Sequence, residues 1–136
     1  ESGFEGQPAM ELEARAAAHG PQAPLADGYA LAGGELDLRP LLVALADESD
    51  PGRGAARFHA TLVAAVADWA ARAGQKCGLT RVALGGGCWV NRILAGGVRE
   101  RLEAAGLTVF EARMVPPGDG GLALGQAWVA RQQLRE

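Results

Sequence analysis

LGGGCWVN, residues 84–91, separates a short apolar run from a helical pattern, and it decides how the chain is expected to fold. A second glycine-rich stretch, PPGDGG at 116–121, separates the next apolar run from the last helical pattern. Turns of this kind present backbone N–H groups at the start of a helix, where they can bind phosphate or a metal-bound oxyanion. Two such turns in one small chain predict a nucleotide site.

The residues around these turns predict alternating strands and helices. Strands are expected at 81–84 and 107–111, and helices at 89–105 and 120–134. Alternation of this kind produces parallel strands joined by right-handed crossovers, and hence an α/β fold. One face of the helix at 89–105 is expected to pack on the sheet, and it consists of Val90, Leu94, Val98 and Leu102.

The N-terminal half is predicted to be mostly helical. A first helix at 8–19 begins with Pro8 and stops before Gly20-Pro21. A hairpin is expected from 29–31 and 35–38 around Gly33-Gly34, followed by a short helical segment at 41–46. A longer helix at 55–73 is expected to cover a sheet with the apolar stripe of Phe58, Leu62, Val66, Trp69 and Ala70.

The composition describes one domain with a core, spanning residues 1–136. The chain is 49% hydrophobic and 21% charged, as in ordinary globular proteins. Its net charge of −3 gives no electrostatic case for a nucleic-acid partner, and no apolar run approaches the roughly 20 residues of a membrane helix. We expect a cytoplasmic protein in which Cys77 and Cys88, too far apart for a metal or redox motif, are ordinary buried thiols.

The first glycine-rich turn allows three interpretations. A dinucleotide-binding GxGxxG pattern counted from Gly85 puts Val90 where the third glycine should stand, and no Lys-Ser/Thr pair follows as in a phosphate-binding P-loop. A purely structural turn and another type of nucleotide-binding turn remain, and Asn91 favours the second because its amide offers a donor and an acceptor. A bond from Asn91 to the local backbone is the alternative.

Several motifs in order resemble one family, and together they cover nearly the whole chain. They are FEGQ at 4–7, AMELE at 9–13, LDLRPL at 36–41, ARFHATL at 56–62, GG at 86–87, NRIL at 91–94 and VPPGDGGLALGQA at 115–127. They resemble the C-terminal domain of the HypF-type carbamoyltransferases, which mature [NiFe]-hydrogenases. The resemblance implies one lobe of an actin-like ATPase (ribonuclease H-like) fold, with a mixed sheet flanked by helices.

The resemblance also implies a reaction and a set of contacts. The family makes carbamoyl adenylate from carbamoyl phosphate and ATP, then carbamoylates the C-terminal cysteine of HypE, which leads to the cyanide ligand of the hydrogenase iron. By the resemblance, Gly86, Gly87 and Asn91 contact the nucleotide, Glu5 and Gly6 are weaker candidates, and Asp119 joins histidines of the other lobe around a divalent metal. O-carbamoyltransferases, tRNA threonylcarbamoyl-adenosine synthases and a non-catalytic protein-binding module remain alternatives.

Other parts of the family's pattern have no match in these residues. The metal-binding histidines and the family's other domains are missing, so the chain reads as a half-domain excised from a larger polypeptide. No catalytic residue can be assigned, and we expect this half to be inactive by itself and weakly self-associating through an open face. His59 is expected to be a packed structural histidine, and Asp119 could simply cap a helix. The small residues after Asp119 are expected to pack against the sheet.

Overall fold

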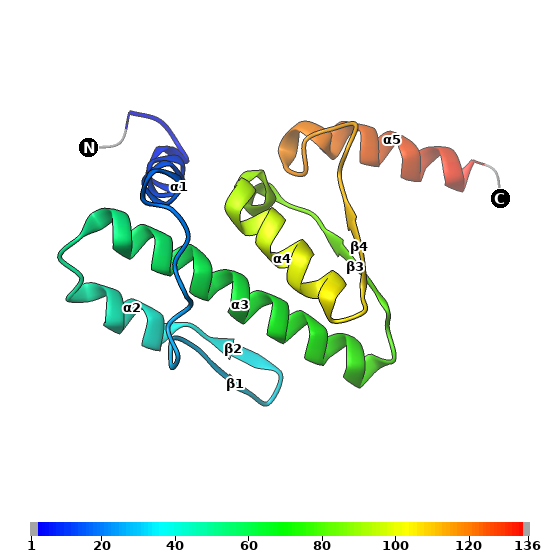
Figure 1. The fold of residues 1–136 in the computed structure, drawn as a ribbon. Helices are drawn as coiled ribbons and strands as arrows, with labels where there is room; N and C mark the ends of the chain where they lie inside the picture. Colours follow the sequence, from blue (N-terminus) through cyan, green and yellow to red (C-terminus); the bar gives the residue numbers. More distant parts are fainter. Residues whose placement is uncertain (1–2, 135–136) are drawn as a thin grey trace.

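The computed structural model describes residues 3–134, which form five α-helices and four short strands (Figure 1). Their order is α1 (Gln7–His19), β1 (Ala30–Ala32), β2 (Glu35–Asp37), α2 (Arg39–Ala46), α3 (Pro51–Cys77), β3 (Arg81–Leu84), α4 (Arg92–Ala104), β4 (Thr108–Glu111) and α5 (Leu122–Gln133). Two 3-10 turns, η1 (Gly87–Val90) and η2 (Asp119–Gly121), lie in the glycine-rich stretches. Each predicted helix and strand is therefore present, with shifted ends.

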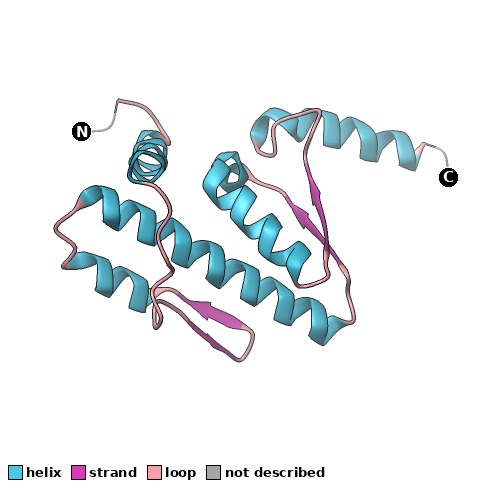
Figure 2. Ribbon diagram, viewed as in Figure 1, coloured by secondary structure: helices cyan, strands magenta, loops and turns pink. Residues whose placement is uncertain are grey.

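The strands form two separate pairs in the described residues, where one mixed sheet was expected (Figure 2). β1 and β2 make an antiparallel hairpin whose turn needs positive φ at both Gly33 and Gly34. β3 and β4 are parallel, from Arg81 opposite Thr108 to Leu84 opposite Glu111, and α4 makes the crossover between them. The helix α3 lies between the two pairs, so they cannot join (Figure 1). The mixed α/β class is confirmed, with small sheets and a helix-rich architecture.

The long helix α3 extends beyond its predicted ends because both of its ends are capped. The Asp50 carboxylate accepts hydrogen bonds from the N–H groups of Gly52 and Arg53, at 2.8 and 3.0 Å. This is a standard N-cap, and it precedes a proline at the first helical position. At the other end Gly78 has φ of 66°, the left-handed conformation that stops helices.

The predicted apolar stripe on α3 is confirmed in part, since Leu62, Val66 and Ala70 pack against the core. Near the start of the helix, Ala55 and Ala56 pack against Ala16 of α1. Farther along, Val63 and Ala67 pack against α4. Small residues at these crossings are buried, whereas Trp69 of the predicted stripe is 43% exposed. Trp69 lies outside the buried face because α3 packs mainly on α1 and α4, where a sheet was expected.

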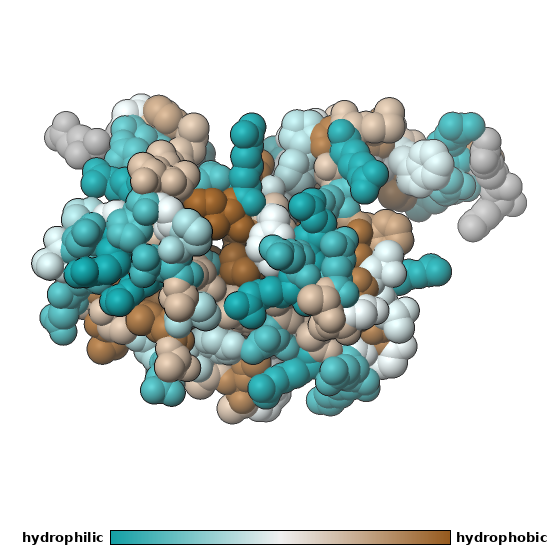
Figure 3. All heavy atoms as spheres, in the orientation of Figure 1, coloured by the Kyte–Doolittle hydropathy of each residue, from teal (hydrophilic) through white to brown (hydrophobic). Residues whose placement is uncertain are grey.

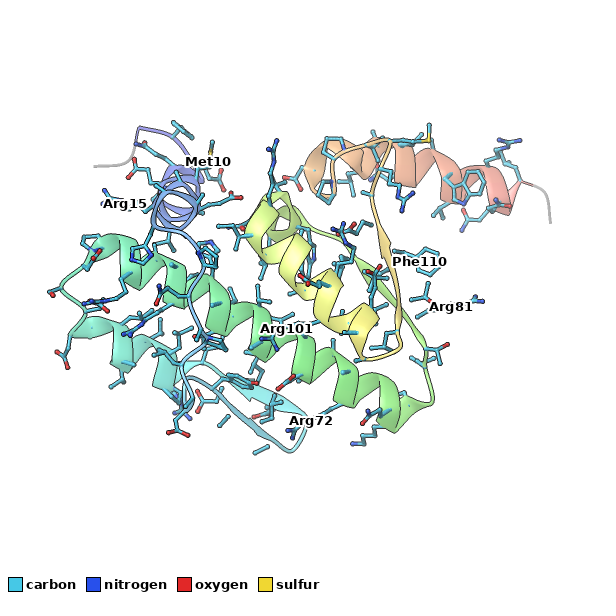
Figure 4. The ribbon with its side chains drawn as sticks, in the orientation of Figure 1. Met10, Arg15, Arg72, Arg81, Arg101 and Phe110 are labelled. Atoms are coloured by element: carbon cyan, nitrogen blue, oxygen red, sulfur yellow. The ribbon has the colours of Figure 1, made fainter. Side chains whose placement is uncertain are left out.

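The core between α3, α4 and the β3–β4 pair agrees with the arrangement predicted from the alternating strands and helices. Val98 and Leu102 of α4 are fully buried and meet Val63. Val90 was expected on the same face but is 63% exposed, since α4 begins only at Arg92. The outer face of the strand pair is uncovered in the described residues, and Phe110 projects from it, away from α4 (Figure 4).

Two adjacent glycines of α4 give a stability prediction with opposite signs. A methyl group on Gly97 would lie 2.8 Å from Cγ1 of Val63, a stiff and nearly buried side chain, whereas one on Gly96 would meet nothing within 4 Å. Gly96→Ala should therefore raise the free energy of unfolding by about 0.5–1 kcal/mol through helix propensity. Gly97→Ala should lower it by about 1–3 kcal/mol through overpacking. Denaturant unfolding of both variants checks this, and shifts of the same sign would contradict it.

The last helix, α5, has no buried residue among those described. Leu122, Leu124, Trp128 and Val129 are each more than half exposed, and the helix extends away from the rest of the fold (Figure 1). The expectation that the small residues of this helix pack against the sheet is therefore wrong for the chain as described. No described helix is both long and apolar enough to cross a membrane.

Candidate functional site

The two glycine-rich turns meet in the fold. The Gly86 N–H donates a hydrogen bond to the carbonyl of Pro117 at 2.7 Å, and a Cβ on Gly118 would lie 3.2 Å from the Cα of Gly87. The turns follow β3 and β4, and the carboxyl ends of parallel strands lie at the same edge of a sheet. Ligands of open parallel sheets bind at this edge. We call the two turns, residues 85–91 and 116–121, the nucleotide turn and the PPGDGG turn.

The nucleotide turn leaves backbone donors available. Gly86 has φ of 109°, which side chains rarely tolerate, and it turns the chain into η1. The N–H groups of Gly87 and Cys88 open η1, and the described residues give them no acceptor. Gly87 and Cys88 are both exposed, and a Cβ added to Gly87 would meet nothing within 4 Å. A phosphate oxygen is the kind of group that such donors bind.

Asn91 lies at the boundary of the nucleotide turn and α4, where its side chain is half-buried. It is the N-cap of α4, and its Oδ1 accepts a hydrogen bond from the Leu94 N–H at 2.9 Å. The predicted helix at 89–105 included Asn91, and this placement is wrong because α4 begins only after the Asn91 cap. The alternative interpretation, a hydrogen bond between the Asn91 side chain and the local backbone, is confirmed by this cap. An amide has two donors and two acceptor lone pairs, so a ligand contact remains compatible with the cap.

The histidine at position 59 contacts Asn91 from α3. His59 is 2% exposed, with Nδ1 2.8 Å from the carbonyl oxygen of Ala55 and Nε2 2.9 Å from Nδ2 of Asn91. The prediction of a packed, hydrogen-bonded histidine is confirmed. Its partner across 32 residues of chain could not be predicted from the local pattern.

A second side chain reaches the same helix end from α1. The Glu13 carboxylate accepts a hydrogen bond from the Arg92 N–H at 2.7 Å. A negative charge at a helix N-terminus is favourable, and here it occupies one of the first donors of α4. Side chains therefore satisfy the N–H groups of Arg92 and Leu94 at the start of α4. Sequence reasoning missed Glu13 because the two residues are 79 positions apart.

The remaining predicted site residues are less closely associated with the nucleotide turn. Glu5 and Gly6 lie exposed at the start of α1, and Gly6 is its N-cap with φ of 83°. No hydrogen bond within residues 3–134 links either of them to the two glycine-rich turns. The structure thus brings Gly86, Gly87 and Asn91 together in one turn and places Glu5 and Gly6 on another element.

Asp119 begins η2 in the PPGDGG turn, and it is exposed. The alternative that it caps the following helix is wrong, since Gly121 stands at the N-cap of α5 and no side chain bonds there. The residues that the structure describes contain no group of three or more His, Cys, Asp or Glu that could hold a metal ion. Asp119 could supply one ligand, but a metal needs several donors in fixed geometry.

The thiol nearest the site is exposed. Cys88 lies in η1 and Cys77 ends α3, and both are free and exposed, so the expectation of buried thiols is wrong. Neither cysteine takes part in a disulfide bond within the described residues. The donors that the site offers to a ligand are therefore backbone N–H groups.

Two hollows adjoin these elements, each of about 680 Å³. One lies beneath α5 and is lined by Gly85, the PPGDGG turn and α5 side chains such as Gln126. The other lies between α1, α3 and α4, where hydrophobic residues gather in Figure 3, and His59 forms part of its wall. Only the first hollow touches both glycine-rich turns.

Comparison with known proteins identifies the family. Residues 1–126 match the family model described as "Carbamoyltransferase, Kae1-like Domain, second subdomain". The chain is 50% identical over 131 residues to the carbamoyltransferase HypF of Rhizobium leguminosarum bv. viciae, covering 95% of this chain and 17% of that protein. It is 56% identical over 102 residues to the carbamoyltransferase HypF2 of Cupriavidus necator, covering 75% of this chain and 13% of that protein.

A solved structure has the same fold. The crystal structure of full-length HypF in the phosphate- and nucleotide-bound form matches with a TM-score of 0.79 and 32% identity, over 100% of this chain and 18% of that one. The chain thus spans less than a fifth of the length of these relatives. It belongs to the HypF carbamoyltransferases, as a second subdomain of their Kae1-like domain.

Proposed function

We propose that this chain forms the nucleotide-binding side of a HypF-type carbamoyltransferase active in hydrogenase maturation. The observation that carries the proposal is the meeting of the two glycine-rich turns at the carboxyl ends of β3 and β4, with the N–H groups of Gly87 and Cys88 open to a ligand. The similarity over the whole chain to a HypF structure with bound phosphate and nucleotide supports it.

In this proposal the nucleotide turn binds ATP or carbamoyl adenylate. Gly86 shapes the turn, Gly87 lets the phosphates approach the backbone, and Asn91 uses its remaining donor and acceptor on the ribose or base. Preorganised N–H donors stabilise negative charge on a phosphate that transfers, and holding the reactants in place lowers the entropic part of the barrier. Carbamoyl phosphate and ATP are the proposed substrates, and a HypE-like protein is the proposed acceptor of the carbamoyl group.

Glu5, Gly6 and Asp119 have weaker support. We propose Glu5 and Gly6 as outer contacts of the nucleotide and Asp119 as a single ligand of a divalent metal. The described residues do not fit a complete metal site by themselves. No step of the proposed reaction is therefore derived from a metal.

The proposed function can be tested in a full-length protein. A chimera in which this chain replaces the matching segment of the Rhizobium leguminosarum relative should support carbamoyl transfer, because 50% identity over 131 residues preserves the fold of the exchanged part. The chimera is incubated with carbamoyl phosphate, ATP and HypE. Mass spectrometry should then detect a carbamoylated C-terminal cysteine.

The unmodified relative is the positive control, and a chimera assayed without ATP is the negative control. A chimera that folds, as judged by its unfolding transition, but transfers no carbamoyl group while the relative does, would contradict the proposal. Transfer at a rate within about 10-fold of the relative, a difference of about 1.4 kcal/mol in the barrier, would support it.

A further inference from the structure

We propose that His59 is a positioning residue for the nucleotide turn, and that it acts by holding the Asn91 amide in the orientation in which that amide meets the nucleotide. The inference rests on the proposed function, because it concerns how the proposed contact is oriented. Its structural basis is a chain of hydrogen bonds from the backbone of α3, through the His59 ring, to Asn91.

The direction of each bond follows from the partners at the two ends. The Ala55 carbonyl can only accept, so Nδ1 of His59 carries the proton and donates to it at 2.8 Å. The Leu94 N–H can only donate, so the oxygen of the Asn91 amide faces Leu94 and its nitrogen faces His59. Nε2 of His59 therefore accepts from the Asn91 Nδ2–H, at 2.9 Å, and the ring is neutral with one defined tautomer.

Both bonds are needed to fix the plane of the Asn91 amide. The N-cap bond alone holds the oxygen and leaves the amide nitrogen free to swing around it. The bond to His59 holds the nitrogen as well. One N–H and one lone pair of Asn91 then remain, and both point in set directions.

His59 is well placed to act as the fixed end of this link. It is 2% exposed on α3, which packs against both α1 and α4, so its ring has little freedom. Asn91, in contrast, lies four residues past the last of three consecutive glycines, the residues with the most backbone freedom. Removing the acceptor at position 59 should leave the nucleotide turn in place but allow the Asn91 amide, the proposed nucleotide contact, to change its orientation.

The test measures ATP binding by the chimera and its variants by isothermal titration. His59→Leu should raise the Kd for ATP about 10-fold, the size expected for a lost buried hydrogen bond. His59→Gln should restore binding to within about 3-fold, because its Oε1 can accept from Asn91. His59→Phe keeps the ring volume without an acceptor, and it takes the place of the leucine variant if that variant does not fold.

The second histidine of the chain supplies the matched control. His19 is exposed at the end of α1, so His19→Leu should change the Kd less than about 2-fold. In an Asn91→Ser background, where serine can still cap α4 but is too short to reach His59, His59→Leu should add no further loss. A merely structural histidine would lower the unfolding temperature of every variant without this dependence on Asn91.

The outcomes separate the inference from the function on which it rests. If Gly87→Val, measured alongside, leaves ATP binding unchanged, the nucleotide turn is not the binding site and both proposals are wrong. If Gly87→Val removes binding but folded His59→Leu and His59→Phe bind ATP as the parent does, only the positioning role is wrong. A loss in these variants that is rescued by glutamine supports it.

Discussion

Gly87→Val in the chimera is expected to reduce ATP affinity at least about 100-fold, a loss of about 2.7 kcal/mol. A branched side chain at position 87 would stand beside the N–H groups of Gly87 and Cys88 and hinder the backbone approach of the phosphate that the proposal requires. Isothermal titration with ATP measures the loss directly.

The fold itself should tolerate this substitution, and that makes the test specific. Gly87 does not have a positive φ, and a Cβ there would meet nothing within 4 Å. Gly86 would be a poorer choice, since its φ of 109° would strain any side chain. Gly96→Ala is the matched control, because its Cβ also meets nothing and it lies within α4. A folded Gly87→Val protein with unchanged affinity would refute the assignment of the turn.

The elements and their adjacency could largely be predicted from the sequence. Apolar runs at 81–84 and 107–111, separated by a helical pattern, required parallel neighbours, and this placed the two glycine-rich turns at one edge. The same local reasoning predicted the hairpin at Gly33-Gly34. These features depend on residues close in sequence or on the handedness of the chain.

Features that depend on distant partners could not be predicted. The buried face of α3 is set by α1 and α4 together. A stripe chosen to face one sheet was right for Leu62, Val66 and Ala70 but included the exposed Trp69. It also missed Val63 and Ala67, which are buried. The ties from Glu13 to Arg92 and from His59 to Asn91 span 79 and 32 residues. The hydrophobic pattern within one segment cannot indicate contacts between residues this far apart in the sequence.

The start of α4 shows how one misplaced boundary changes a functional prediction. Periodicity extended the helix back to residue 89, which put Val90 in the core and Asn91 one turn inside. The Asn91 side chain caps the helix instead, and η1 replaces its expected first turn. The candidate residues stay the same, but the N–H groups proposed to face a ligand become those of Gly87 and Cys88. Caps are set by side-chain geometry, which the hydrophobic pattern does not record.

The second large effect is expected when the 136-residue chain is assayed alone: we expect no carbamoylated HypE, although the chimera carries out the transfer. The family's fold is proposed to hold its nucleotide between two lobes, and we propose that these residues form one side of that cleft. Asp119 stands exposed with no group of metal ligands around it in the described residues, and α5 buries nothing.

The measurement is mass spectrometry of HypE after incubation with carbamoyl phosphate, ATP and equal molar amounts of either protein. The chimera serves as the positive control, and it differs from the isolated chain only in the remaining part of the relative. Loss of the second lobe should remove orientation of the two substrates, a contribution of roughly 7–11 kcal/mol where positioning is complete. Residual transfer by the chain alone should therefore fall below detection, and turnover comparable to the chimera would show that one lobe holds the whole active site.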